Sequence, residues 1–157
     1  MSYLIKNNIQ NLFVSSTNTS SQLVSTTEIT LNGSEVYYTP HPQANKVIYD
    51  YNFSYSWYPD SSSLLFLEIE QESGGTYSSL GTEWRRIAPG SSTSNLSTNC
   101  SLMYILDPWQ GSKGTRLRAR SYTTSWEATA HITRTYHQSL TDKLVFPSLK
   151  MYSIIGD

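Results

Sequence analysis

Three glutamates alternate along one predicted strand and have the best spacing in the chain for acid–base chemistry. Glu68, Glu70 and Glu72 occupy every second position, so neighbouring carboxylates would lie about 7 Å apart on one face of the strand. Glycosidases use carboxylate pairs at such separations, but their two groups flank a cleft and usually come from different strands. We therefore interpret this glutamate stripe as a solvated or interface face.

The histidines and the single cysteine form no recognisable catalytic or metal-binding motif. His41 lies between two prolines, and His131 and His137 share one face of a predicted strand, a spacing that carries no zinc signature. We interpret all three as ordinary surface histidines, while the alternation around Cys100 predicts a core position. The sequence also lacks the G-x-S-x-G nucleophile motif and the phosphate-binding loop. We expect no catalytic residue, no metal and no cofactor.

Aromatic residues near turns are better candidates for a binding site. Trp109 lies in the turn D-P-W-Q-G-S-K-G, where an exposed indole could stack on the apolar face of a sugar or contact a protein. Trp84, which is followed by Arg85 and Arg86, could serve the same ligand, since arginine pairs with the carboxylates of acidic glycans. Tyr77 is a further candidate. The alternatives are that Trp84 covers the core and that Trp109 folds back on its own loop.

The segment Lys46–Tyr58 is the element around which the other strands must be arranged. It reads K-V-I-Y-D-Y-N-F-S-Y-S-W-Y, with a period of two that predicts a long strand with one buried face. Tyrosine hydroxyls need hydrogen-bond partners, which a dry core supplies poorly. We therefore predict that Tyr49 and Tyr51 are subunit contacts in a threefold interface, and not only core. The large side chains on that face are Val47, Tyr49, Tyr51, Phe53, Tyr55 and Trp57.

A stripe of arginines on a later strand carries charge opposite to the glutamate stripe. Arg116, Arg118 and Arg120 alternate with small or apolar residues. They either face solvent or meet the glutamates across a sheet or a subunit boundary, where opposite charges set the register. On the subunit-boundary interpretation, we assign Arg118 to an oligomer interface.

Composition excludes several classes of partner. The chain has 157 residues, of which 15% are charged, and a net charge of −1, so it has no basic field to attract nucleic acid or an anionic membrane. No apolar run approaches the length of a transmembrane helix, and we expect no membrane insertion. The single cysteine excludes an intrachain disulfide and favours synthesis in a reducing cytosol.

Turn chemistry predicts an all-β fold. Asn32-Gly33 predicts a two-residue hairpin, as does Gly74-Gly75. About eight or nine strands joined by such turns predict an antiparallel jelly-roll β-sandwich. We assign residues 1–21 to a lead-in or shaft connection and residues 22–157 to the jelly-roll domain.

Two stretches of the sequence resemble the C-terminal head domains of virus and bacteriophage fibres. They are Y-Y-T-P-H-P-Q-A-N-K-V-I-Y-D-Y-N-F-S-Y-S-W (37–57) and L-R-A-R-S-Y-T-T-S-W-E-A-T-A-H-I-T-R-T (117–135). The second resembles the arginine-bearing strand, short turn and histidine-containing strand near the end of such heads. This likeness of pattern implies a compact TNF/C1q-like jelly roll and a homotrimer at the tip of a fibre. It also implies an upstream shaft or virion anchor and binding to the host surface.

These expectations combine into a viral attachment protein that is not an enzyme. The chain would be a trimeric fibre head, made in the host cytoplasm and carried on the virion surface. It would bind a host glycan or protein receptor through aromatic residues on its loops. Two alternatives stay open: a structural capsid or capsid-decoration protein with no ligand, and a free carbohydrate-binding module, which is normally monomeric.

Overall fold

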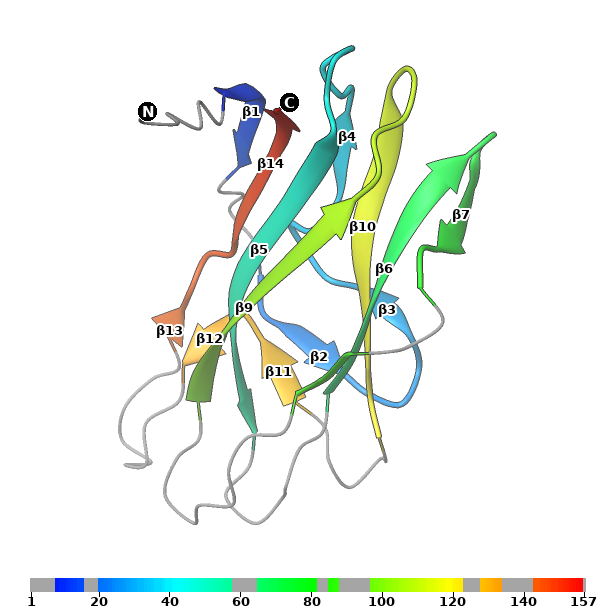
Figure 1. Ribbon diagram of the computed structural model, residues 1–157. Helices are drawn as coiled ribbons and strands as arrows, with labels where there is room; N and C mark the ends of the chain where they lie inside the picture. The colour runs from blue at the N-terminus through cyan, green and yellow to red at the C-terminus, as the bar shows by residue number, and fades with distance from the viewer. Residues whose placement is uncertain are drawn as a thin grey trace.

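The computed structural model shows two antiparallel β-sheets facing each other (Figure 1). It describes residues 8–15, 20–57, 65–81, 85–87, 97–122, 128–133 and 143–156. The all-β antiparallel sandwich predicted from the sequence is confirmed, and none of the described residues is helical. In particular, this part of the chain contains no helix long and apolar enough to cross a membrane.

The first sheet has six strands, and the predicted aromatic strand is the longest of them. The strands are β1 (Asn8–Ser15), β2 (Gln22–Val24), β5 (Lys46–Trp57), β9 (Ser97–Leu106), β11 (Ala128–Ala130) and β14 (Ser148–Ile155). They follow the order β1-β14-β5-β11-β2, and β9 pairs along the other side of β5. Strand β1, which comes from the predicted lead-in, pairs with β14.

The second sheet also has six strands, and β10 and β6 form its centre. Its strands are β3 (Ile29–Thr30), β4 (Val36–Tyr38), β6 (Leu65–Ser73), β7 (Thr76–Ser79), β8 (Arg85–Ile87) and β10 (Lys113–Ser121). The order is β3-β10-β6-β7, with β4 also paired to β10 and β8 to β6. Two short strands, β12 (Ile132–Thr133) and β13 (Lys143–Leu144), pair with each other.

One of the two predicted hairpins is confirmed. Strands β6 and β7 pair with Ser73 opposite Thr76, which leaves Gly74 and Gly75 as the two turn residues. Both glycines have positive φ, at 62° and 84°, as a type I′ turn requires. Glycine is favoured here because other residues adopt this conformation only with strain.

The hairpin predicted at Asn32-Gly33 is wrong, although the turn itself exists. The Ser34 amide donates to the Leu31 carbonyl over 3.1 Å, and Gly33 has a φ of 73°. However, β3 and β4 both pair antiparallel with β10, so the chain does not reverse at this turn. The residues between them form a bulge, and the Ser34 hydroxyl donates to Leu31 and accepts from the amide of Leu117. Pairing with β10 satisfies the backbone of both strands, so they have no need to pair with each other.

That bulge corrects the prediction for the tyrosines of β5. Tyr49 and Tyr51 are both fully buried in the core of one chain. The Tyr49 hydroxyl donates to the carbonyl of Ser34 over 2.5 Å, and the Tyr51 hydroxyl donates to the carbonyl of Asn32 over 2.7 Å. Burial raises the pKa of both phenols, so they stay protonated as donors. The assignment of these two residues to a subunit interface is therefore wrong, because the β3–β4 bulge supplies their acceptors inside the sandwich.

Candidate ligand-binding groove

Strand β5 changes its neighbour along one side, and a groove lies beside that change. β14 pairs with β5 from Lys46 to Asn52, and β11 pairs with it only from Tyr55 onward. Strand β9 runs along the opposite side without interruption. The groove has a volume of about 320 Å³, at the small end of the range of about 300–1,000 Å³ typical of small-molecule sites.

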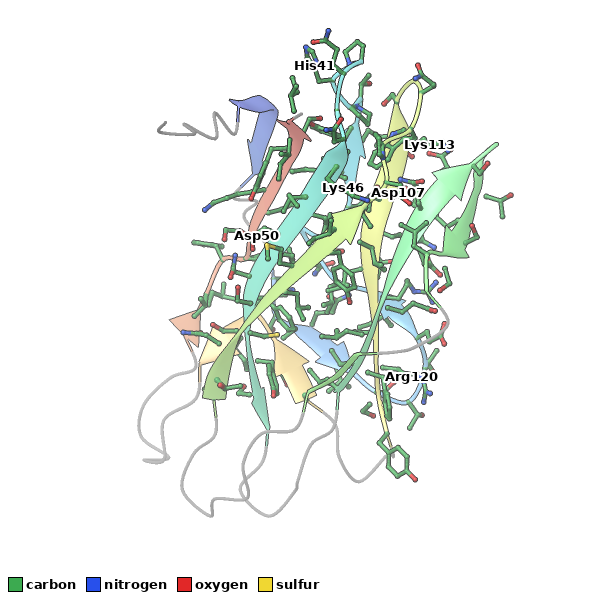
Figure 2. All side chains as sticks on the ribbon, in the orientation of Figure 1. His41, Lys46, Asp50, Asp107, Lys113 and Arg120 are labelled. Atoms are coloured by element: carbon green, nitrogen blue, oxygen red, sulfur yellow. The ribbon has the colours of Figure 1, made fainter. Side chains whose placement is uncertain are left out.

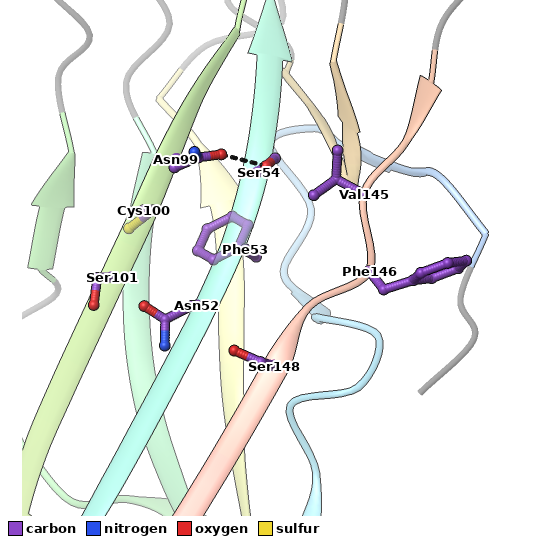
Figure 3. Close-up of a pocket in the computed structure, with 9 residues that line it drawn as sticks. All are labelled: Asn52, Phe53, Ser54, Asn99, Cys100, Ser101, Val145, Phe146 and Ser148. Atoms are coloured by element: carbon purple, nitrogen blue, oxygen red, sulfur yellow. Dashed lines mark hydrogen bonds between the residues drawn. The ribbon is translucent and has the colours of Figure 1, made fainter. Parts of the chain in front are cut away.

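The lining of the groove combines neutral polar groups with apolar ones (Figure 3). The polar contributions come from alternate positions of β5 and β9 and from the first residue of β14. The apolar contributions come from Phe53 on β5, from Cys100 on β9 and from the segment that leads into β14. The lining residues are Asn52, Phe53, Ser54, Asn99, Cys100, Ser101, Val145, Phe146 and Ser148.

Two asparagine amides in the groove are held in place and still offer hydrogen bonds. The Asn52 amide donates to an Asp50 carboxylate oxygen over 3.0 Å, and the Ser54 hydroxyl donates to the Asn99 side-chain oxygen over 2.5 Å (Figure 3). An amide carries two donors and an acceptor with two lone pairs. Each asparagine therefore keeps hydrogen-bonding capacity beyond the one contact that orients it. A ligand with both donor and acceptor groups, such as a hydroxyl-bearing molecule, would match this lining.

Among the described residues that line the groove, none carries a charge at neutral pH. The single titratable side chain is Cys100, and burial raises its pKa to about 11, so it remains a thiol. The core position predicted for Cys100 is confirmed, with only 8% of the residue exposed. The closest carboxylate in the hydrogen-bond network is Asp50, which lies on β5 outside the lining (Figure 2). The groove therefore suits a neutral ligand better than an ionic one.

One wall of the groove is formed by Val145 and Phe146. Phe146 is 54% exposed, and its ring extends from this segment on the side away from the asparagine side chains (Figure 3). The Val145 amide donates to the carbonyl of His131 over 2.9 Å, and the His131 amide donates to the carbonyl of Ser54 over 2.6 Å. His131 thus ties the wall to β5, in addition to the pairing of Ser148 with Asn52 at the start of β14. His131 is fully buried, so its interpretation as a surface histidine is wrong.

Trp109, the leading sequence candidate, lies elsewhere and is not a free platform. Its indole is partly buried against the core cluster and meets the ring of Tyr38 edge-on, with centroids 6.2 Å apart. Its Nε1 donates to the carbonyl of Tyr38 over 3.2 Å. Nearby, Asp107 pairs with Lys46 over 2.6 Å, and this contact lowers the pKa of the Asp107 carboxyl (Figure 2). The expected exposed indole is wrong, because Tyr38 supplies both a packing surface and an acceptor.

The other predicted ligand residues are not gathered around one site in the described structure. The Tyr77 hydroxyl donates to Glu35 over 2.5 Å, and its ring lies 3.8 Å from the guanidinium carbon of Arg116. The backbones of Arg85 and Arg86 pair with β6 in the second sheet. Trp84 lies outside the described residues. A binding role for these four residues stays a prediction.

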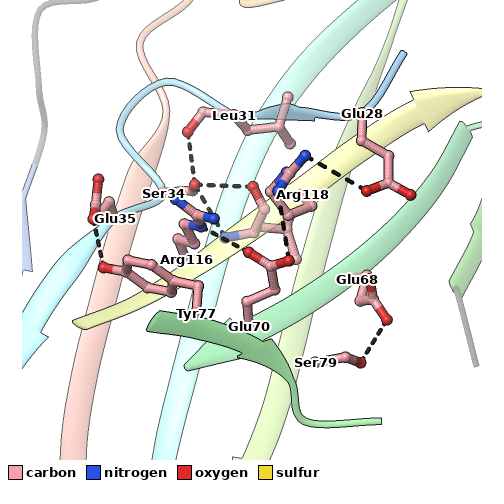
Figure 4. Close-up of polar contacts among 11 residues, drawn as sticks. Glu28, Leu31, Ser34, Glu35, Glu68, Glu70, Tyr77, Ser79, Arg116 and Arg118 are labelled. Atoms are coloured by element: carbon pink, nitrogen blue, oxygen red, sulfur yellow. Dashed lines mark hydrogen bonds and ion pairs between the residues drawn. The ribbon is translucent and has the colours of Figure 1, made fainter. Parts of the chain in front are cut away.

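The glutamate and arginine stripes meet on the outer face of the second sheet (Figure 4). Arg116 lies opposite Glu70 in the β10–β6 register, and its Nε donates to that carboxylate over 2.8 Å. Arg118 lies 3.5 Å from both Glu70 and Glu28. The interpretation that the two stripes meet across a sheet is confirmed within one chain. A place for Arg118 in a subunit contact stays a prediction.

The groove was not identified from the sequence, although part of its signal was visible. Asn52 and Ser54 occupy the polar face of the predicted aromatic strand, and Asn99 and Ser101 alternate in the same way on β9. Nothing local in the sequence shows that these two faces lie side by side, or that Phe146 borders them. Among the described residues, no group of three or more His, Cys, Asp or Glu side chains could hold a metal ion.

No protein-family model matches the sequence. No curated protein matches it either. The chain is similar to two solved structures, each described as a pentameric capsid protein isolated from metagenomic phage sequences. The first shares 15% sequence identity with this chain at a TM-score of 0.29. The match covers 87% of this chain and 66% of the length of the other chain. The second shares 17% sequence identity at a TM-score of 0.27, and the match covers 87% of this chain and 60% of the length of the other chain.

The comparison corrects the predicted oligomer. Both similar structures are described as pentameric, whereas a homotrimer was expected from the sequence. The homotrimer is contradicted by this finding. Its physical basis is lost as well, because Tyr49 and Tyr51, the residues chosen as threefold contacts, hydrogen-bond within one chain.

Proposed function

We propose that this chain is a virion protein that binds a neutral glycan of the host surface in the groove between β9 and β14. The β-sandwich and the resemblance of two sequence stretches to fibre heads support the virion role. The observation that carries the binding role is the lining of the groove: neutral amides and hydroxyls around about 320 Å³, with the exposed residue Phe146 at one edge.

The chemistry of this lining matches that of a sugar. A sugar ring presents hydroxyls that both donate and accept, which amide and hydroxyl side chains can satisfy together. It also presents an apolar face of C–H groups, which packs on an aromatic ring. Arginine pairs well with the carboxylates of acidic glycans, and no arginine is among the described residues that line the groove. The proposed ligand is therefore an uncharged mono- or disaccharide unit at the end of a glycan.

A glycan array tests this proposal directly. The full chain should bind neutral glycans in preference to sialylated ones, and Phe146→Ala should weaken binding by roughly tenfold, in line with the loss of one well-packed aromatic contact. The matched control is Tyr37→Ala, which removes an aromatic residue that is 60% exposed on β4, away from the groove. Equal loss in both variants, or a preference for sialylated glycans, would contradict the proposal. Absence of binding to every glycan would favour a purely structural role in the capsid.

A further inference from the structure

His131 connects the two sides of the groove through its backbone. Its amide donates to Ser54 on β5, and its carbonyl accepts from Val145 in the opposite wall, over 2.6 Å and 2.9 Å. Ser54 and Val145 both line the groove. His131 has a φ of 66° and is the one non-glycine residue with positive φ in the described part of the chain. This conformation is uncommon for a residue with a side chain, so the surrounding contacts must hold it in place.

The side chain of His131 is held in an apolar site. The residue is completely buried, and its ring lies 6.1 Å from the ring of Phe53, a groove residue. Neither ring nitrogen has a hydrogen-bond partner among the described residues. Burial accordingly lowers the pKa of His131 from 6.5 to about 4. A protonated imidazole would be a buried cation with no acceptor, which is a strongly unfavourable state.

Among the described side chains, the titratable groups on β5 and β9 do not offset that cost. On β5 these are Tyr51 and Tyr55, and on β9 the nearest to Phe53 in the register is Cys100. Burial raises the pKa of all three groups, so they are neutral at pH 7 and in mild acid. Asp50 lies on the polar face of β5, opposite to the face that carries Phe53. Among the described side chains, no carboxylate contacts the imidazole.

We propose that His131 is a pH-sensitive switch for the groove: protonation drives its side chain out of the core and breaks the backbone link that runs from Val145 through His131 to Ser54 on β5. The groove is then formed at neutral pH and opens in mild acid, so a ligand bound outside the cell would be released in an acidified compartment. The biological purpose rests on the glycan-binding function proposed above. The switch itself does not, because its opening can be measured without any glycan.

Cys100 provides a specific reporter, because it is the single cysteine in the chain and lines the groove. The probe is 4,4′-dithiodipyridine, which reacts with thiols in acid, and each rate on the full chain is divided by the rate of glutathione at the same pH. We expect His131 to have a pKa near 6.5 in the open state and near 4 in the closed state. This difference predicts that the normalised reaction rate of Cys100 rises about 30-fold between about pH 7.5 and about pH 5. His131→Asn, which cannot be protonated and tolerates positive φ, should show a flat profile.

Three results would overturn the switch. The first is a flat profile in the wild-type chain, and the second is an equal rise in His131→Asn. The third is a rise that coincides with loss of the far-ultraviolet circular dichroism signal, which would indicate global unfolding. If His131→Asn does not fold, His131→Gly provides the same comparison with less backbone strain. Hydrogen exchange of the Val145 amide in the wild-type chain gives a further measure. After correction for the intrinsic exchange rates, the protection of the Val145 amide should fall in acid relative to the protection of the Tyr49 amide. A constant ratio of the two protection factors would count against the switch.

Discussion

On the outer face of the second sheet, Glu70 lies between two arginines, whereas on the outer face of the first sheet Asn52 and Asn99 keep hydrogen-bonding groups toward a groove. In the second sheet, the charges are used within the chain, where they pair neighbouring strands and set their register. In the first sheet, neutral groups are oriented by one contact each and retain capacity for a ligand. The difference indicates that the charged face stabilises the fold, and it leaves the neutral face as the one for which we propose binding.

The largest expected effect is a loss of stability in acid, caused by protonation of His131 beside the groove. Because burial lowers the pKa of His131 from 6.5 to about 4, the folded chain favours the neutral imidazole. This stabilisation is fully present above about pH 6.5 and is lost as the pH falls toward about 4, at a total of about 3 kcal/mol. Urea unfolding at a series of pH values should show this loss in the wild-type chain and a much smaller loss in His131→Asn. Parallel losses in both chains would place the acid sensitivity elsewhere.

The second effect concerns the charged face. Glu70 has a side chain that is only 12% exposed and accepts from Arg116 while lying near Arg118. Glu70→Gln removes the charge that both arginines face, and we expect a loss of about 2 kcal/mol in the free energy of unfolding. The control is Glu68→Gln, on the same strand and face but with no ion pair recorded within the described structure. Glycan binding should be unchanged in both variants. A binding defect in Glu70→Gln would contradict the assignment of binding to the neutral face alone.

A smaller effect on the free energy of unfolding is expected from a substitution at Gly114, which lies on β10 beside the charged face. A Cβ atom at Gly114 would overlap with the phenol oxygen of Tyr77 and approach a Glu72 carboxylate oxygen. Gly114→Ala should therefore displace Tyr77 from Glu35 and from Arg116, at a cost of about 1 kcal/mol. Gly81→Ala is the matched control, because a Cβ at Gly81 meets nothing within 4 Å. Equal unfolding curves for the two variants would show that the Tyr77 contacts contribute no stability.

Much of the fold could be predicted because its signals are local. The period of two in β5 identified the central strand, and Gly74-Gly75 identified the β6–β7 turn. The alternating glutamates and arginines also offered pairing across a sheet as one of three interpretations, and this is the one that the structure shows. In each case, the chemistry that forms the element lies within a few residues of sequence or repeats along one strand.

The errors arose where partners come from distant parts of the chain. The Asn32-Gly33 turn forms as predicted, but β10 pairs with both flanking segments and changes a hairpin into a bulge. That bulge supplies the acceptors for Tyr49 and Tyr51, which local reasoning could not provide. The groove is assembled from β5, β9 and the segment before β14, so no single stretch of sequence carries its signal.

The most direct test of the account is to map a neutral glycan onto the full chain by NMR chemical-shift perturbation at neutral pH. We expect the largest shifts at Asn52, Asn99 and Phe146, with little change at Trp109 or Tyr77. Shifts centred on Trp109 and Tyr77, or no shifts at any tested concentration of a glycan that the array identifies, would contradict the assignment of binding to the neutral groove.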